Sequence, residues 1–128
     1  TNTAIYKIRV NGSVIIFCPD NELNPEDVEK GTDFYLRLKT FFEGADILVH
    51  DGQYSLESYE NKRGWGHSAW QTVVDFARSA GVKNLFITHH DPDSTDGALA
   101  HLDKTLQQEF ADDFESIQLA KEGTQLLI

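Results

Sequence analysis

The first part of the chain alternates apolar and polar residues over two short runs, AIYKIRV (4–10) and SVIIFC (13–18). The dipeptide Asn11-Gly12 separates the two runs. An Asn-Gly pair between alternating runs is a strong short-range signal for a two-residue turn, so this pattern predicts an antiparallel β-hairpin. The acidic, turn-rich segment 19–33 that follows is predicted to be a loop.

Three later segments carry the spacing of amphipathic helices, with apolar residues recurring every three or four positions. They are residues 34–42, the segment between Ser68 and Gly81, and residues 95–111. The second segment is the clearest, because Ser68 and Gln71 have capping-box spacing and Gly81 follows the last apolar position. Its predicted apolar face comprises Trp70, Val73, Val74, Ala77 and Ala80.

Short apolar runs between and after these helices predict further strands at residues 46–50, 84–88, 116–120 and 124–128. The predicted order is therefore a β-hairpin, then helices and strands in alternation, then two terminal strands. Such alternation is typical of layered α/β folds, in which ligands bind at the carboxyl ends of the strands. We predict a single α/β domain or half-domain over residues 1–128.

Composition narrows the possible partners and location. The chain holds 21 acidic and 11 basic residues, for a net charge of −10, and no basic patch stands out, which disfavours bulk binding to nucleic-acid backbones. A single cysteine, Cys18, cannot form an internal disulfide and suits a reducing compartment, so we expect a cytoplasmic protein. Because no apolar run approaches the roughly 18–20 residues of a membrane span, no membrane partner is expected.

Ionisable side chains directly follow three of the predicted strands. Asp20 follows the hairpin, Asp51 follows the next strand, and His89-His90-Asp91 follows the third. One such ending indicates only turn chemistry, but three indicate a shared site if the strand ends converge. A carboxylate from Asp20 and an imidazole suit zinc, iron or manganese. Adjacent histidines point in different directions, so either His89 or His90 is the expected ligand.

The segment RGWGHSAW (63–70) places a histidine directly before the predicted start of a helix. Free amides and the helix dipole favour anions there, so His67 is a candidate to donate a hydrogen bond to an oxyanion or to protonate a leaving group. The competing interpretation is that Trp65 and Trp70 are core residues and that His67 only covers the loop. From this segment alone, the competing interpretation is slightly favoured. His50 and His101 are expected to have structural and surface roles.

Taken in order, four segments resemble the C-terminal half of the metallo-β-lactamase superfamily, in the branch that includes tRNase Z and related phosphodiesterases. They are IIFCPDNE, LVHDGQY, GHSAW and LFITHHDPD, and the likeness extends over about residues 13–128. The resemblance puts the metal-bridging aspartate on Asp20, the last metal histidine on His89 and the catalytic histidine on His67. Asp51 replaces the family glutamate that holds this histidine. The implied fold is half of an αββα sandwich.

The main metal motif of this superfamily, His-x-His-x-Asp-His, is absent, and no histidine precedes Asp20. We therefore expect a missing N-terminal half or a second chain to complete the site, and negligible catalysis by these 128 residues alone. The resemblance implies two divalent metal ions, zinc first, with manganese or iron as alternatives. The predicted function is a metal-dependent hydrolase, phosphodiesterase-like, acting on a phosphodiester or small-molecule substrate.

Two other classes of protein stay open. Asp20, Asp51, Thr88 and Lys121 stand at strand ends in the order of the acidic site, phosphoacceptor, hydroxyl and lysine of a receiver domain. This alternative ranks lower because the chain opens with a hairpin and because a receiver leaves the GWGHS segment unexplained. The other alternative is a non-catalytic half-fold that forms a homo-oligomer through exposed apolar surface.

Overall fold

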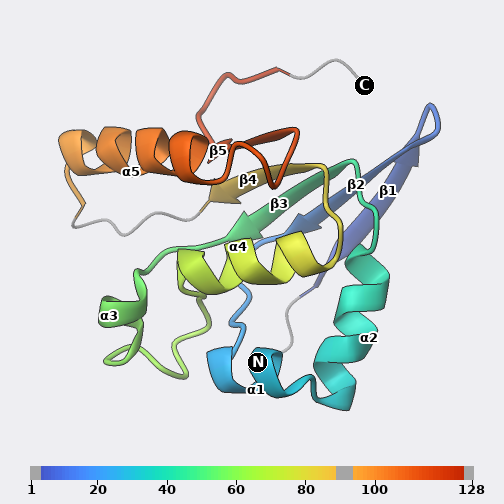
Figure 1. Cartoon of the computed structure of the whole chain (residues 1–128), viewed down its shortest axis with the longest axis horizontal. Helices are drawn as coiled ribbons and strands as arrows, with labels where there is room; N and C mark the ends of the chain where they lie inside the picture. Colours follow the sequence, from blue (N-terminus) through green and yellow to red (C-terminus); the bar gives the residue numbers. More distant parts are fainter. Residues whose placement is uncertain (1–3, 89–93, 126–128) are drawn as a thin grey trace.

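A computed structural model describes residues 4–88 and 94–125 of the protein. Figure 1 shows a single sheet with helices packed against it. In chain order the elements are β1 (Tyr6–Val10), β2 (Ser13–Cys18), α1 (Pro25–Lys30), α2 (Asp33–Phe42), β3 (Ile47–Asp51), α3 (Leu56–Tyr59), α4 (Trp70–Ser79), β4 (Asn84–Thr88), α5 (Asp96–Glu109) and β5 (Ser116–Leu119). The predicted α/β class is confirmed.

The five strands lie in the sheet in sequence order, β1-β2-β3-β4-β5. β1 and β2 form the predicted antiparallel hairpin, and Asn11 and Gly12 both have positive φ, as a type I′ turn requires. The remaining neighbours pair in parallel, with Asp51 of β3 opposite Thr88 of β4. The carboxyl ends of β2, β3 and β4 therefore meet at one edge of the sheet.

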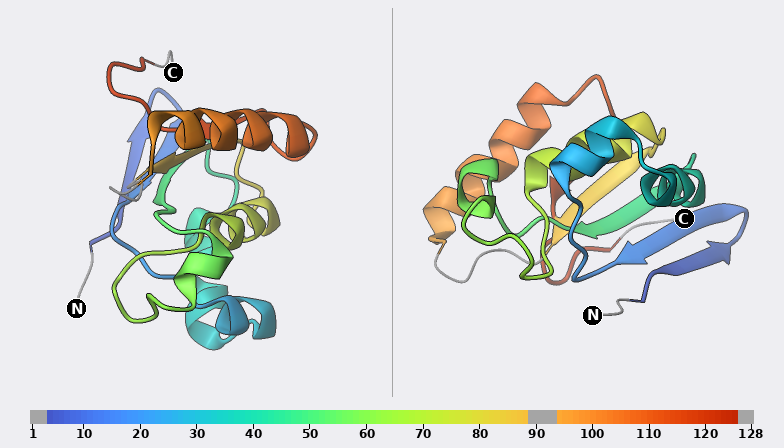
Figure 2. Two further views of the ribbon diagram at one scale, coloured as in Figure 1. Left: turned by 90° about the vertical axis from the view of Figure 1, so that its left-hand side faces the viewer. Right: turned by 90° about the horizontal axis from the view of Figure 1, so that it is seen from below.

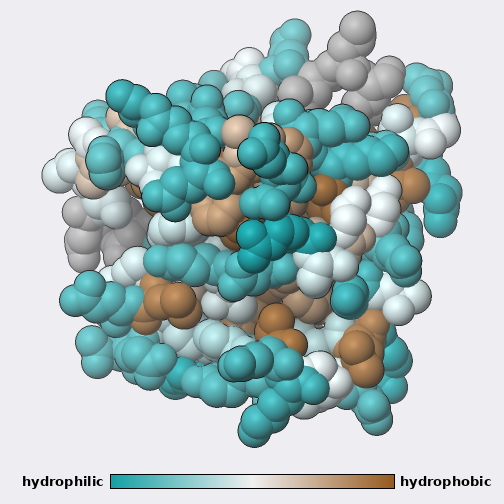
Figure 3. Space-filling view, viewed as in Figure 1, coloured by the Kyte–Doolittle hydropathy of each residue, from teal (hydrophilic) through white to brown (hydrophobic). Residues whose placement is uncertain are grey.

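The helices gather on one side of this sheet. Both views of Figure 2 show α1, α2 and α4 on that side, with α5 alongside β5. The strand side chains that face the helices form the core together with apolar residues of α2, α4 and α5, and they include Ile16, Cys18, Leu48, Leu85, Ile87, Ile117 and Leu119. The helical side of the molecule is mostly hydrophilic at its surface, with scattered apolar residues (Figure 3).

The other face of the hairpin carries a row of exposed apolar side chains. Strand residues alternate between faces, so Phe17 points away from the helices while its neighbours Ile16 and Cys18 point toward them. Phe17 pairs with Tyr6, and Ile8 and Val10 follow on the same face of β1. All four are more than a third exposed. We call Tyr6, Ile8, Val10 and Phe17 the outer hairpin face.

The structure corrects two helix predictions. The segment predicted as a loop contains α1, because the side chain of Asn24 caps the amides of Glu26 and Asp27 and Pro25 occupies the first turn. The helix predicted to start at Ser68 begins at Trp70, and Ala69 takes the cap position. Its predicted apolar face is otherwise buried, although Trp70 is only partly so.

The structure also bears on the burial of Trp65 and on the predicted strand 124–128. Trp65, considered as a core residue, is 63% exposed. The predicted strand 124–128 is not seen at positions 124–125, and its remaining positions lie outside the described residues. Among the helices of residues 4–88 and 94–125, none combines the length and apolar character needed to cross a membrane.

Candidate active site

Asp20, Asp51 and His67 come together at the carboxyl ends of β2 and β3. Asp51 is the last residue of β3, and Asp20 lies two positions after β2, its parallel neighbour. His67 arrives from the loop before α4. One ligand atom of each residue lies within 4.8 Å of the others. The structure thus brings together three of the four predicted site residues.

Asp51 and His67 form a close pair. Asp51 Oδ2 lies 2.5 Å from His67 Nδ1, and Asp51 Oδ1 accepts a hydrogen bond from the amide of Gln53 at 3.0 Å. The Asp51 side chain is fully buried, and the ring of Tyr54 packs edge-on against the imidazole. With Asp51 as acceptor, Nδ1 carries a proton, so Nε2 is the acceptor nitrogen of the neutral ring. A buried carboxylate therefore sets the tautomer and orientation of His67.

Asp20 differs from Asp51 in exposure and backbone conformation. Its side chain is 58% exposed, and its Oδ1 lies 3.8 Å from His67 Nδ1. The residue has a φ of 46°, in the left-handed region that aspartate tolerates better than most residues. This conformation turns the chain sharply after β2. The site therefore combines one buried and one solvent-facing carboxylate beside a single imidazole.

His50 has the structural role expected of it. The ring is fully buried, and burial lowers its pKa to about 4, so it is neutral near pH 7. Its Nδ1 donates to the carbonyl of Asp51 at 2.7 Å, and its Nε2 accepts from the amide group of Asn21 at 3.2 Å. The ring thus joins the end of β3 to the loop after β2.

Cys18 and His101 also match their expected roles. Cys18 is buried in the core, and burial raises the pKa of its thiol to about 12, so it packs as a small apolar residue. His101 is exposed on α5. Neither residue belongs to the site.

Ser68 joins the two loops that carry Asp20 and His67. Its hydroxyl accepts from the amide of Leu23 at 2.8 Å and donates to the carbonyl of Asn21 at 2.5 Å. Both partners are more than 40 positions away in sequence. Because its oxygen is engaged in this way, Ser68 does not cap α4 as the capping-box spacing predicted.

Glu22 forms a second tie between the same loops. Its carboxylate accepts hydrogen bonds from the amides of Gly64 and Gly66, both at 2.9 Å, and from the hydroxyl of Tyr59 at 2.8 Å. Both glycines have positive φ, which turns their amides onto the carboxylate. Burial raises the pKa of Glu22, but these hydrogen bonds outweigh it and hold the pKa below its ordinary value.

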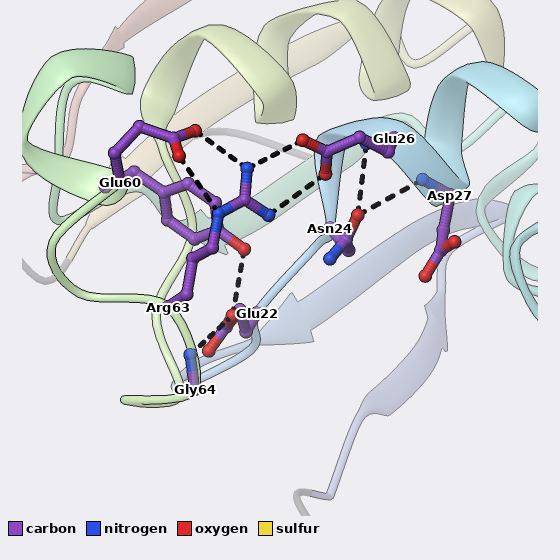
Figure 4. A network of polar contacts seen from close by, with 8 residues as sticks. Glu22, Asn24, Glu26, Asp27, Glu60, Arg63 and Gly64 are labelled. Carbon is purple, nitrogen blue, oxygen red and sulfur yellow. Dashed lines mark hydrogen bonds and ion pairs between the residues drawn. The ribbon is translucent and has the colours of Figure 1, made fainter.

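Arg63 extends this network toward α1. Its guanidinium contacts the carboxylates of Glu26 and Glu60 at 2.6 and 2.7 Å, as Figure 4 shows beside Glu22. These side chains are a third or more exposed, so each ion pair contributes little by itself to stability. Their effect is to orient the start of the GWGHS loop.

Sequence reasoning missed Glu22, Tyr59 and the bridging role of Ser68. Glu22 stands in an acidic stretch where nothing distinguishes it from its solvated neighbours. Its partners lie 37 to 44 positions away, so no local pattern pairs them. An acid two positions after the strand-end Asp20, together with glycines on both sides of Trp65, is the weak signal that was present.

The donor set of the described residues fits a divalent metal ion. Two carboxylates and one imidazole offer the oxygen and nitrogen ligands that zinc and manganese accept. Asp51 and His67 engage each other closely, so the exposed carboxylate of Asp20 is the donor best placed to face an ion. A complete coordination shell needs ligands beyond these three residues.

The predicted metal ligand His89 and its neighbour His90 lie outside the described residues. They follow Thr88, the residue that pairs with Asp51 across β3 and β4. The prediction that Asp20 and His89 share a cation therefore stays a prediction.

The geometry excludes the receiver-domain alternative. A receiver has a parallel sheet with strand order 2-1-3-4-5, whereas here β1 is antiparallel and the order is sequential. The proposed phosphoacceptor Asp51 is fully buried and hydrogen-bonded through both oxygens. The proposed lysine, Lys121, pairs instead with Asp103 at 3.3 Å.

Comparison with known proteins identifies relatives of one kind, although no family model matches the chain. Ribonuclease Z of Pseudomonas putida is 32% identical over 123 residues, which cover 85% of this chain and 34% of that protein. Ribonuclease Z of Thermoplasma acidophilum is 31% identical over 129 residues, covering 90% of this chain and 40% of the relative. The chain thus spans about a third of the length of these relatives.

A solved structure agrees with these relatives on the fold. The metallo-beta-lactamase fold protein YhfI from Bacillus subtilis superposes with a TM-score of 0.63 over 94% of this chain and 42% of its own, at 18% identity. The fold predicted from the sequence motifs is therefore confirmed. The chain thus has the metallo-β-lactamase fold, and its sequence is similar to a part of the proteins named Ribonuclease Z.

Proposed function

We propose that this chain carries part of the active site of a metal-dependent phosphodiesterase that acts on RNA. The observation that carries the proposal is the pair of buried Asp51 and partly buried His67, with the exposed carboxylate of Asp20 only 3.8 Å from the same imidazole. A titratable ring held by a buried acid, beside a candidate metal ligand, suits hydrolysis of a phosphate ester. The relatives named Ribonuclease Z support RNA as the substrate.

Each residue has a distinct role in this proposal. Asp20, with His89 and ligands from outside this chain, would hold divalent metal ions, which supply an activated water and offset negative charge when bound. Asp51 holds the Nδ1 proton of His67 and stabilises the imidazolium form. The opposite nitrogen, Nε2, then donates a hydrogen bond to a phosphate oxygen or protonates the leaving oxygen. We assign zinc as the metal, with manganese or iron as alternatives.

Further parts of the site must come from elsewhere, either a preceding N-terminal half or a second chain. The chain spans only about a third of its relatives' length, and the described ligands are too few for a closed metal site. Its net charge of −10 also repels RNA backbones, so most of the RNA-binding surface lies outside this chain. The outer hairpin face offers the apolar surface on which the remaining part would pack. A cytoplasmic location fits this role.

The test uses the protein in its catalytically complete form, that is, this chain together with whatever supplies the remaining ligands. Two substrates are assayed, an RNA oligonucleotide and the small diester bis(p-nitrophenyl) phosphate. We expect Asp51→Asn and His67→Ala to lower kcat by about 100-fold or more, the range typical of lost acid–base catalysis. The matched control is His101→Ala, an exposed histidine on α5, which should retain full activity.

Removal of metal completes the test. Chelation should abolish hydrolysis of both substrates, and added zinc or manganese should restore it. Full activity after chelation, or near-normal turnover by both Asp51→Asn and His67→Ala, would refute the proposal.

A further inference from the structure

Trp65 stands out because it is a large apolar side chain left in solvent beside the proposed site. At 63% exposed, it has the highest exposure among the large apolar side chains of the described residues. It lies two positions from His67, so the two backbones are at most about 7 Å apart along the chain. Single exposed apolar residues are common, but an exposed indole on the same short loop as His67 is a candidate ligand contact.

Backbone hydrogen bonds at Trp65 and at its two neighbours fix the loop that leaves the indole exposed. The amides on both sides of it, from Gly64 and Gly66, donate to the carboxylate of Glu22, and its own amide donates to the carbonyl of Lys62 at 3.1 Å. The preceding Arg63 is held by two carboxylates (Figure 4). The loop therefore presents the indole from a backbone fixed at three successive positions.

A positive charge accompanies the indole. The ammonium of Lys62 lies 4.0 Å from the centroid of the Trp65 ring, within the range of a cation–π contact. In a chain of net charge −10, this contact keeps a cation beside the exposed indole. Stacking of a ligand on the indole does not depend on the sign of the protein's charge. The acidic surface therefore does not prevent such stacking.

We propose that Trp65 is a stacking platform for a nucleobase of single-stranded RNA, with Lys62 meeting the adjoining phosphate. The proposal rests on the function proposed above, since it assumes an RNA substrate cleaved near His67. Unpaired bases of RNA bind proteins mainly by stacking on aromatic side chains, and each base offers a face for such stacking. The platform would tolerate different bases and would hold the strand close to the bond that is cleaved.

Tryptophan fluorescence tests the contact without requiring hydrolysis. The chain has two tryptophans, so Trp70→Phe leaves Trp65 as the reporter. Titration of this variant with a short single-stranded RNA, in chelator so that no cleavage occurs, should quench the emission. A strand of the same length with abasic positions should quench several-fold less, because it offers phosphates without stacking faces.

Steady-state kinetics, measured on variants that keep Trp70, provide a second readout. In the catalytically complete form, Trp65→Ala should raise KM for RNA about tenfold, as loss of one stacked base predicts, and leave kcat and bis(p-nitrophenyl) phosphate hydrolysis unchanged. Trp65→Phe should recover part of the loss. The matched control is Phe34→Ala, an aromatic of similar exposure on α2, which should leave KM unchanged.

The outcomes separate this inference from the proposed function. Equal quenching by normal and abasic strands, or an unchanged KM in Trp65→Ala, would overturn the stacking platform even if the protein hydrolyses RNA. Base-dependent quenching in a protein that hydrolyses neither substrate would support the platform and overturn the proposed function instead.

Discussion

The two faces of the β1–β2 hairpin differ sharply although they alternate along the same strands. On β2, Ile16 is fully buried against the helices, whereas its neighbour Phe17 is 41% exposed on the outer hairpin face. The inner face is covered by this chain's own helices, whereas the outer hairpin face is more than a third exposed at each of its four residues. The difference teaches that, within the hairpin, burial comes from the side of the sheet that the helices cover.

The candidate site lies at the carboxyl ends of the strands rather than on either face of the hairpin. Asp51 is placed there by β3, and the loops that carry Asp20 and His67 are joined by hydrogen bonds that Glu22 accepts and that Ser68 makes. Polar ties of this kind demand defined geometry, which suits residues that must meet within hydrogen-bond distance.

The largest expected effect contrasts neighbouring residues on the two faces. Ile16→Ala should lower the free energy of unfolding by about 2–5 kcal/mol, because it leaves a cavity in the packed core. Phe17→Ala should cost less than about 1 kcal/mol in this chain by itself, since its side chain is already partly in water. Urea denaturation measures both changes, and equal losses would show that the outer hairpin face is packed as tightly as the inner one.

A smaller effect is expected where Ser68 joins the loop before α4 to the loop after β2. Ser68→Ala should lower the free energy of unfolding by about 1–3 kcal/mol, because the buried amide of Leu23 and the carbonyl of Asn21 lose their partner. The matched control is Ser79→Ala, whose hydroxyl bonds only to a carbonyl of its own helix and should cost less. Thermal melts of the two variants side by side give the comparison, and a neutral Ser68→Ala would mean that the loops hold together without this tie.

The smallest effect on stability is expected on the outer hairpin face itself. The double change Ile8→Lys and Phe17→Lys should shift the melting temperature by only a few degrees while reducing self-association of the isolated chain. Size-exclusion chromatography over a range of concentrations measures the association. A wild-type chain that stays monomeric at every concentration would argue against this face as an assembly surface.

Much of the fold followed from local patterns. The Asn11-Gly12 turn and the alternation around it were enough to predict the hairpin, and helical spacing located α2, α4 and α5 to within a few residues. The signals for α1 were also present, in Asn24, Pro25 and Gly31, but its acidic composition made a loop the expected result. The wrong prediction arose because the acidic composition was given more weight than the capping residues, although those residues are a local signal.

The errors at Ser68 and Trp65 have a different origin. Ser68 satisfies the capping-box spacing, yet a loop distant in sequence offers its hydroxyl two backbone partners. The hydroxyl bonds to those partners instead of capping α4. Trp65 is large and mostly apolar, but the glycine amides on either side of it donate to Glu22 and hold its backbone at the surface. Local propensity cannot register partners of this kind.

By itself the sequence determined the alternation of elements and the placement of acids and histidines after strands, because both depend on periodicity and turn chemistry within a few residues. Only the tertiary structure decided that Asp51 is the buried partner of His67, that Asp20 faces solvent beside them, and that Glu22 and Ser68 hold their loops together. These contacts join residues 16 to 47 positions apart. Their geometry exists only once the parallel pairing of β2 and β3 has brought the strand ends side by side.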